Sequence, residues 1–282
     1  MALKIYLLSS EIAPFAEQYS LAQFTNRIST RLNEKDHDIR LIMPKYGFIS
    51  SRKYVLREVI RLQDIEAKWQ NEVVTGNVRS AFIPETKVQV YFLDLPAYFD
   101  DVSHLLYKAR NGRPLRGNVD RFGLFVKISL RTLEKLYWQP DVIVANDWAS
   151  AFAIPLQKML LSREDFFSET KSVFVLHSLD EFLRFSGSAL RDAGVSPHAV
   201  DMEITDDTRL IDLAVALADE VVFVNTPENN IEAEVAEDST LNAITANRNQ
   251  APKTLTLQEN NEETWQQAAA EFESVLNDSI EK

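Results

Sequence analysis

The sequence predicts an α/β protein, a single Rossmann-like domain with a mainly parallel sheet and helices on both faces. Three observations support this fold class. The chain has 282 residues, 45% of them hydrophobic, which suffices for one large α/β domain. Short apolar runs alternate with amphipathic segments of helical spacing, the order typical of parallel sheets. Residues 1–46 read strand, helix, strand, as in the opening unit of Rossmann-like folds.

Each element follows from the local pattern. The opening unit consists of a buried strand at 3–9, a helix at 20–35 and a second strand at 37–43. The later elements are expected, in chain order, as a hairpin at 65–84 with its turn at 75–77, a strand at 88–93, a polar loop at 104–117, a helix at 119–138, a strand at 141–145, a helix at 149–161, a strand at 171–176, a helix at 206–218 and a strand at 220–224. Thr226-Pro227-Glu228 then predicts a helix start, with Thr as the N-cap.

The C-terminal part of the sequence changes character. Residues 239–261 are rich in Asn, Gln, Thr and Ala and have no apolar face, which indicates a polar linker. An amphipathic helix follows, with Trp265 and Phe272 on one face. We therefore expect a domain over residues 1–238, a linker over 239–261 and a C-terminal helix over 262–282 that packs back on the domain.

Composition excludes several classes of function. The net charge of -12 argues against nucleic acid as a partner. The absence of cysteine excludes disulfides, thiolate zinc sites and thiol catalysis. No apolar run reaches the length of a membrane span and no signal peptide opens the chain, so a cytoplasmic protein is expected. His37 and His198 lack metal-ligand neighbours, and we expect neither a metal nor a cofactor.

The first turn of the predicted fold lacks its usual chemistry. Rossmann-like folds hold a ligand phosphate at this turn, where glycines let backbone amides approach the anion. Here residues 1–46 contain no glycine, and the turn carries Glu17, Gln18, Tyr19 and Ser20. The scaffold for anion binding is present, but a carboxylate and a bulky ring replace the expected groups.

Seven collinear segments carry a resemblance to a known family. They are Ser9–Phe15, His37–Gly47, Val90–Asp100, Asn118 with Arg121-Phe122, Pro140–Trp148, Val173–His177 and Ala218–Val222. Together they resemble the N-terminal catalytic half of bacterial glycogen and plant starch synthases, which transfer glucose from ADP-glucose to a growing α-1,4-glucan. The resemblance implies one half of a GT-B glycosyltransferase.

The departures from that family fall on its chemistry. The family's Lys-x-Gly-Gly-Leu loop, whose lysine and amides meet the donor's phosphates and glucose, aligns with residues 17–21. It is a degenerate donor loop, in which Glu17 replaces the lysine. The two histidines that flank the family's Asp-Trp pair are here Asn146 and Ala149, and Ser178 replaces an asparagine. His177 is kept.

The resemblance implies candidate site residues, and each also has a structural interpretation. His177 and Asp147 are the catalytic candidates if the site is active. Substrate binding is implied for Glu11, Trp148 and His177: His177 would meet the donor, and Asp147 and Trp148 would support an acceptor sugar. Alternatively, His177 is satisfied by backbone groups, Asp147 is a helix N-cap, Trp148 is core and Glu11 is a solvated loop residue.

Two functions of different classes remain open. In the family, the active site lies between two Rossmann-like domains, and this chain has one, with a last helix that resembles the family's crossover helix. The first hypothesis is a synthase-like protein of glycogen metabolism that binds α-glucan or a partner and is not catalytic by itself. The second is an active ADP-glucose:glucan glucosyltransferase completed by a partner chain. We expect a homodimer or a partner chain at the former inter-domain face if that face is apolar.

Overall fold

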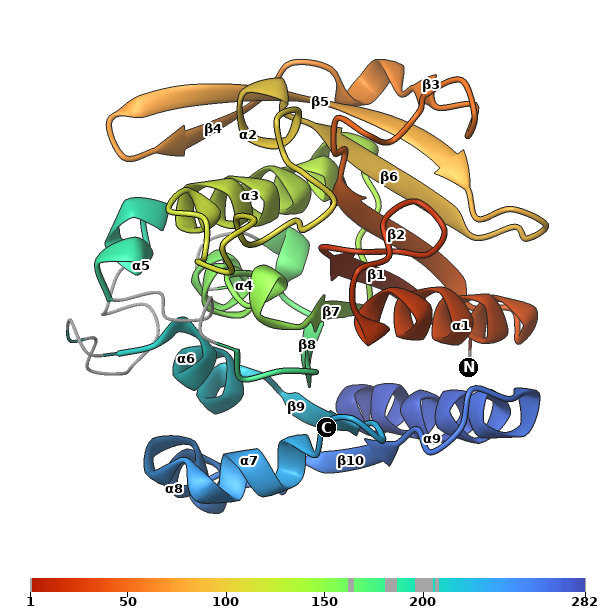
Figure 1. Cartoon of the computed structure of the whole chain (residues 1–282), viewed down its shortest axis with the longest axis vertical. Helices are drawn as coiled ribbons and strands as arrows, with labels where there is room; N and C mark the ends of the chain where they lie inside the picture. The colour runs from red at the N-terminus through yellow and green to blue at the C-terminus, as the bar shows by residue number, and fades with distance from the viewer. Residues whose placement is uncertain (1, 162–164, 181–186, 196–204, 206–207, 282) are drawn as a thin grey trace.

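The computed structural model describes residues 2–161, 165–180, 187–195, 205 and 208–281 (Figure 1). Its centre is a ten-stranded mixed sheet with the order β10-β9-β8-β7-β1-β2-β6-β5-β3, and β4 pairs with β5 off this path. The strands are β1 (Lys4–Ser9), β2 (Asp38–Pro44), β3 (Arg57–Glu58), β4 (Ile65–Trp69), β5 (Glu72–Phe82), β6 (Gln89–Asp94), β7 (Val142–Asn146), β8 (Lys171–Leu176), β9 (Glu220–Asn225) and β10 (Lys253–Thr256). The helices are α1 (Ser20–Glu34), α2 (Pro96–Phe99), α3 (Asn118–Leu136), α4 (Ala153–Leu161), α5 (Gly187–Ala193), α6 (Leu210–Leu217), α7 (Ile231–Glu237), α8 (Ser239–Ala246) and α9 (Glu262–Ile280).

The predicted fold class is confirmed. The sheet is parallel from β10 to β6 and antiparallel at the edge formed by β3 and β5. Leu7 of β1 lies opposite Leu41 of β2 on one side and Val144 of β7 on the other. These residues are fully or almost fully buried. Continuous apolar runs form such strands because helices cover both faces of the sheet.

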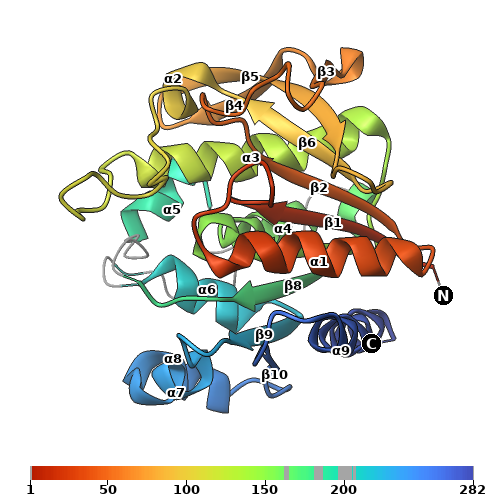
Figure 2. The same cartoon turned by 45° about the vertical axis from the view of Figure 1, so that its right-hand side comes forward.

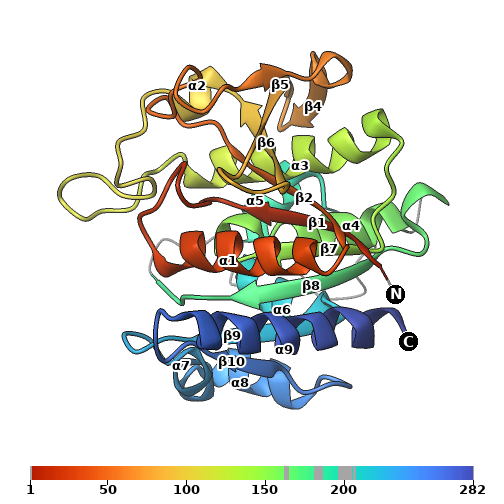
Figure 3. The same ribbon diagram turned by 90° about the vertical axis from the view of Figure 1, so that its right-hand side faces the viewer.

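Two layers of helices enclose the sheet. Helices α1 and α9 lie side by side on one face, and α3, α4 and α6 cover the other (Figures 2 and 3). The contact between α1 and α9 includes Phe24 and Phe272, whose ring centroids are 5.9 Å apart. Arg31 forms an ion pair with Glu262 at 2.6 Å, and Glu273 pairs with Lys35. The last helix therefore packs on the first one although about 240 residues separate them along the chain.

The hairpin over residues 65–84 forms, but its turn differs from the prediction. The strands β4 and β5 are joined at Gln70 and Asn71, and Gln70 has a positive φ of 52°. Gly76 lies inside β5, opposite Ile65. A Cβ atom there would meet the side chain of Leu95 at 3.0 Å. Glycine is needed at this position because the core side chains lie close to the backbone of β5, and not because the chain turns there.

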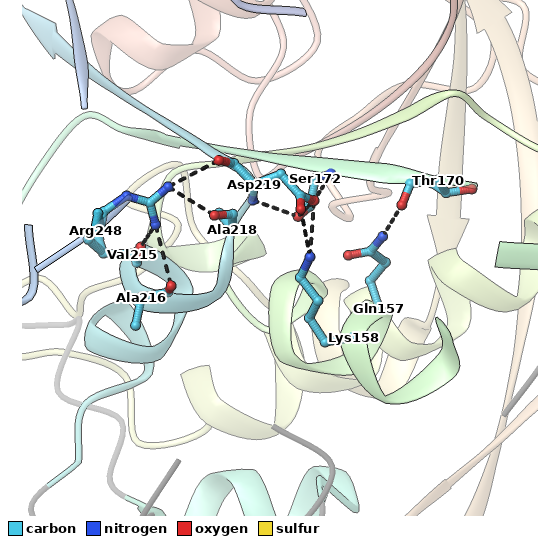
Figure 4. A network of polar contacts seen from close by, with 9 residues as sticks. All are labelled: Gln157, Lys158, Thr170, Ser172, Val215, Ala216, Ala218, Asp219 and Arg248. Carbon is cyan, nitrogen blue, oxygen red and sulfur yellow. Dashed lines mark hydrogen bonds and ion pairs between the residues drawn. The ribbon is translucent and has the colours of Figure 1, made fainter. Parts of the chain in front are cut away.

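The segment 239–261 differs from the expected linker because it contains helix α8 and strand β10. The strand pairs in parallel with β9, and Leu255 is its buried residue. Arg248 joins the two elements to the domain. Its guanidinium donates to the carbonyls of Val215, Ala216, Ala218 and Asp219 around the end of α6 (Figure 4). Helices end with unpaired carbonyls, so this arginine satisfies groups that the helix cannot.

Two helix starts also differ from prediction. Thr226 does not cap a helix, because residues 226–229 form a turn in which the amide of Thr226 donates to the carbonyl of Asn229 at 2.8 Å. Helix α7 begins at Ile231 after Asn230, whose side chain caps Ala233 at 3.0 Å. Helix α6 begins at Leu210, whereas the sequence predicts a start at 206, and residues 206–207 lie outside those described.

Candidate functional site

The carboxyl ends of the parallel strands meet around one cavity, which we call the strand-end cavity. It has a volume of about 260 Å³. Residues 18–21, 107, 147–148, 177–178, 180, 226 and 228–229 line it. These follow β1, β7, β8 and β9 or come from the loop before α3. The chain leaves β1 toward β2 on one side and returns to β7 on the other, and ligands of open α/β sheets bind at such switch points.

Glu11 holds the loop that precedes α1. Its carboxylate accepts hydrogen bonds from the backbone amides of Gln18 and Tyr19, the latter at 3.1 Å. Its other oxygen accepts a hydrogen bond from the hydroxyl of Tyr107 at 2.6 Å. The hydroxyl of Ser10 forms a hydrogen bond of 2.7 Å with the same Tyr107 hydroxyl. Glu11 is fully buried, so the interpretation as a solvated glutamate is wrong, and it does not line the strand-end cavity.

This arrangement fills an anion-binding position with an internal carboxylate. The amides of Gln18 and Tyr19 are the groups that an anion would meet at a Rossmann-type first turn. Burial raises the pKa of Glu11 to about 7. The hydrogen bonds from Tyr107, Gln18 and Tyr19 lower the pKa, but burial has the larger effect. Around neutral pH, protonated and ionised Glu11 are therefore both populated.

Asp147 connects the ends of β7 and β8. Its backbone has φ 63° and ψ 178°, a region that is essentially restricted to glycine. Its carboxylate accepts from the amides of His177 at 3.0 Å and Ser178 at 3.2 Å, and from the hydroxyl of Ser178 at 3.3 Å. It makes no capping bond to the short helix after it, so the N-cap interpretation is wrong. Burial raises its pKa to about 7.

His177 lies at the end of β8 and lines the cavity. Its Nε2 atom lies 2.8 Å from the side-chain oxygen of Asn146. The amide nitrogen of Asn146 is committed to Thr25 at 2.7 Å and Ser9 at 3.3 Å, so its oxygen must accept. Nε2 of His177 therefore carries the proton, and Nδ1 is an acceptor. Burial lowers the pKa of His177 to about 3, and the ring is neutral at physiological pH.

Aromatic side chains form one wall of the cavity. Tyr19 is half-buried and stacks on Tyr107 with ring centroids 5.5 Å apart. Trp148 is 2% exposed, and its ring meets Tyr107 and Phe122 edge-on, each at 5.1 Å. Trp148 thus touches the cavity as part of the core. Tyr19 is the more accessible aromatic ring.

The structure brings most predicted site residues together. Gln18, Tyr19, Ser20, Asp147, Trp148 and His177 line the same cavity. Glu17 is exposed, does not line this cavity and accepts a hydrogen bond from Gln23.

Sequence reasoning does not identify Tyr107, which lines the cavity, or Asn146, which orients His177. Tyr107 lies in a segment whose polarity predicts a loop, and the apolar run Leu105-Leu106-Tyr107 is a signal of burial there. Asn146 is noted as a lost histidine, whereas it orients His177.

No group of three or more His, Asp or Glu among the described residues is placed to hold a metal ion, and His198 lies outside those residues. His37 instead accepts the amide of Leu3 at 3.1 Å and contacts Glu273. Over the same part of the chain, no helix is both long and apolar enough to cross a bilayer. Of the exposed large hydrophobic residues in this part, Val55, Ile60, Val73, Phe82 and Tyr137, none lines the strand-end cavity.

Fold and site together define a class of protein: half of a GT-B-type glycosyltransferase, with its cavity at the switch point. A model of the starch synthase catalytic domain family matches residues 4–243. The chain belongs to this family.

Individual relatives agree with the family. The glycogen synthases of Pelodictyon phaeoclathratiforme and Chlorobium limicola are 35% and 34% identical to it over 176 residues. Each match covers 62% of this chain and 36% of the relative, so the matched region spans little more than a third of those enzymes. Among solved structures, the catalytic domain of starch synthase IV from Arabidopsis thaliana, bound to ADP and acarbose, superposes with a TM-score of 0.71 at 19% identity. That superposition covers 92% of this chain and 52% of the plant domain.

Proposed function

We propose that this domain binds the end of a neutral α-glucan in the strand-end cavity and does not transfer glucose by itself. It would act in glycogen metabolism as a binding or regulatory protein derived from a glycogen synthase. The observation that carries the proposal is the loop before α1, where Glu17, Gln18, Tyr19 and Ser20 stand in place of the family's Lys-x-Gly-Gly residues, and no lysine from the described residues lines the cavity.

The charge of the cavity supports a neutral ligand. Asp147, Asp180 and Glu228 line it, and no lysine or arginine does among the described residues. A charged hydrogen bond to a phosphate contributes roughly 1.5–3 kcal/mol, or about tenfold to more than a hundredfold in affinity. A site that lacks the family's lysine loses that contribution, and the carboxylates that line the cavity add repulsion.

The accessible groups suit a sugar. Tyr19 presents an aromatic ring, and the apolar C–H faces of a pyranose pack on such rings. The acceptor Nδ1 of His177 and the hydroxyl of Ser178 provide hydrogen-bonding groups for sugar hydroxyls. Pockets for small molecules combine apolar walls with a few such polar groups in the same way.

Calorimetric titration tests the proposal. We expect maltoheptaose to bind and ADP-glucose to give no heat of binding at millimolar concentration. Tyr19→Ala should weaken maltoheptaose binding about tenfold, the loss of one ring contact of about 1.4 kcal/mol. Tyr137→Ala, which removes a ring that is 86% exposed at the end of α3, is the matched control and should bind like the wild type. Binding of ADP-glucose that His177→Ala abolishes would contradict the proposal.

An active glucosyltransferase completed by a partner chain is the second candidate. The neutral imidazole of His177 and the carboxyl of Asp147 favour it, because both residues line the cavity and the backbone amide of His177 donates to the Asp147 carboxylate at 3.0 Å. Its test is transfer of labelled glucose from ADP-glucose to maltoheptaose by complexes isolated from the native cells through this protein. Transfer that disappears with His177→Ala would establish it, and complexes without transfer would reject it.

A further inference from the structure

The loop before α3 is strongly basic in an acidic protein, and we call residues 104–117 the basic hairpin. The whole chain has a net charge of -12, but this segment contains no Asp or Glu and carries four cations, Lys108, Arg110, Arg113 and Arg116. The three arginines are exposed. Among the described residues, none of the four cations forms an ion pair with a carboxylate. Within this part of the chain, their charge is therefore not neutralised.

Backbone hydrogen bonds give the basic hairpin a fixed shape. The amide of Ala109 donates to the carbonyl of Arg113 at 2.9 Å, and the amide of Leu115 donates to the carbonyl of Tyr107 at 2.9 Å. The side chain of Asn118 holds the base of the hairpin, because it donates to the carbonyl of Tyr107 at 2.9 Å. A segment held in this way presents its charges in one direction, so a partner that binds it has little backbone entropy to remove.

A group of carboxylates lies next to the strand-end cavity, and we call it the acidic face. It comes from the segment after β8, the turn after β9 and helix α7, and it consists of Asp180, Glu228, Glu234 and Glu237. Burial and the nearby charges of Asp180 and Glu237 raise the pKa of Glu234. None of the four carboxylates forms an ion pair with a lysine or arginine of the described residues. Carboxylates that repel one another in this way favour a cationic partner.

The basic hairpin and the acidic face border the same cavity. Tyr107 of the hairpin lines the strand-end cavity, and so do Asp180 and Glu228 of the acidic face. In Figures 2 and 3 the hairpin projects from the side of the molecule at which the parallel strands end, and α7 lies on the same side, beyond β8 and β9. One surface of the protein thus carries positive charge in one part and negative charge in another.

We propose that this surface binds a second copy of the chain, with the basic hairpin of each protomer on the acidic face of the other. In a dimer with a two-fold axis every contact forms twice, so a surface that carries both complementary patches can pair with itself. An acidic protein of another kind would use the hairpin but leave the acidic face without a partner. Complementary charges also fix the orientation of the two protomers and speed their encounter. This inference goes beyond the proposed function, which needs only one chain.

Sedimentation velocity of the wild-type chain is the first test. In about 0.1 M salt the sedimentation coefficient should rise with protein concentration toward the value of a dimer. In about 1 M salt, where the screening length falls to about 3 Å, the dissociation constant of the dimer should increase at least about tenfold. A wild type that stays monomeric at low salt, or a dimer that is indifferent to salt, would overturn the proposal.

Charge reversal then identifies the two patches. Arg110→Glu combined with Arg113→Glu makes the hairpin acidic, and Glu234→Lys combined with Glu237→Lys makes α7 basic. Each double variant by itself should be monomeric, because both of its contacts would join like charges. An equal mixture of the two double variants should dimerise again, because both contacts of the mixed dimer join opposite charges.

The matched control is Lys87→Glu combined with Lys135→Glu. It changes the net charge as much as the hairpin variant does, at exposed positions that do not line the strand-end cavity, and it should dimerise like the wild type. Circular dichroism verifies that each variant is folded, and dimerisation of the mixture verifies it independently. Dimerisation of either double variant by itself, a mixture that stays monomeric, or loss of the dimer in the control would each overturn the proposal.

Discussion

The buried carboxylate of Glu11 gives the domain a specific pH dependence of stability. Burial raises the pKa of Glu11 from 4.5 to about 7 in the folded protein. Protonated Glu11 therefore stabilises the folded state. This stabilisation is fully present below the pKa that Glu11 has in the unfolded chain, and it is lost as the pH rises through the pKa that Glu11 has in the folded protein. Since one pKa unit corresponds to about 1.4 kcal/mol, ionising Glu11 should lower the free energy of unfolding by about 3 kcal/mol between pH 4 and pH 8.

The substitution Glu11→Gln isolates this effect. Glutamine keeps an oxygen that accepts the amides of Gln18 and Tyr19, but it cannot ionise. Asp147 also has a raised pKa of about 7, and His177 has a lowered one, so the wild-type profile alone mixes several groups. The difference between wild type and variant cancels them.

Urea unfolding at pH 5 and pH 8, followed by circular dichroism, provides the measurement. From pH 5 to pH 8 the wild type should lose about 2–3 kcal/mol more of its unfolding free energy than Glu11→Gln. Glu66→Gln, at an exposed position of β4, is the control and should parallel the wild type. Equal pH dependence of wild type and Glu11→Gln would refute the argument that Glu11 is ionised at a free-energy cost in the folded protein.

Three further substitutions test the packing that positions the site. Gly123→Ala should lower the free energy of unfolding in urea by about 1–3 kcal/mol, because the new Cβ would lie 2.0 Å from the ring of Trp69, and this outweighs the better helix propensity of alanine. Gly117→Ala is the control and should be close to neutral, since its new Cβ would lie 3.9 Å from the nearest side-chain atom. Equal effects of the two substitutions would contradict the contact with Trp69. Arg248→Met should leave the carbonyls around the end of α6 without a donor and lower the free energy of unfolding by about 1.5–3 kcal/mol. Amide hydrogen exchange should become faster in α8 and β10 but not in β1. Unchanged exchange would show that another contact holds this edge of the sheet. Phe272→Ala should cost about 3–5 kcal/mol by thermal or urea unfolding, because its ring is fully buried between α9 and α1, and a loss below 1 kcal/mol would mean that α9 adds little to the fold.

Much of the fold follows from the sequence because its elements are long and strongly patterned. The strand over Lys171–Leu176 is predicted at its observed bounds, since residues 173–176 form a continuous apolar run, and two neighbouring strands flank it in the structure. Helix α3 follows from the helical spacing of its apolar residues. These signals are local, so each can be recognised without knowledge of the rest of the chain.

The elements that sequence analysis misplaces have weak local patterns. In the segment 239–261, helix α8 buries only Leu241 and strand β10 only Leu255, which is too little for a periodic signal. The segment is ordered through pairing with β9 and through Arg248, and both are contacts with distant residues. Gly76 shows the same limit, because Thr75-Gly76-Asn77 matches a turn while the core requires a glycine inside the strand.

The sequence by itself determined the class of fold, the family resemblance and the loss of the glycine-rich loop, because these depend on residue identity along the chain. Only the tertiary structure decided what replaces that loop. Glu11, Gln18 and Tyr107 are separated by up to 96 residues, and their contacts depend on how the loop before α3 packs against the end of β1. Burial, which sets the pKa of Glu11 and the neutral state of His177, is likewise a property of the assembled core.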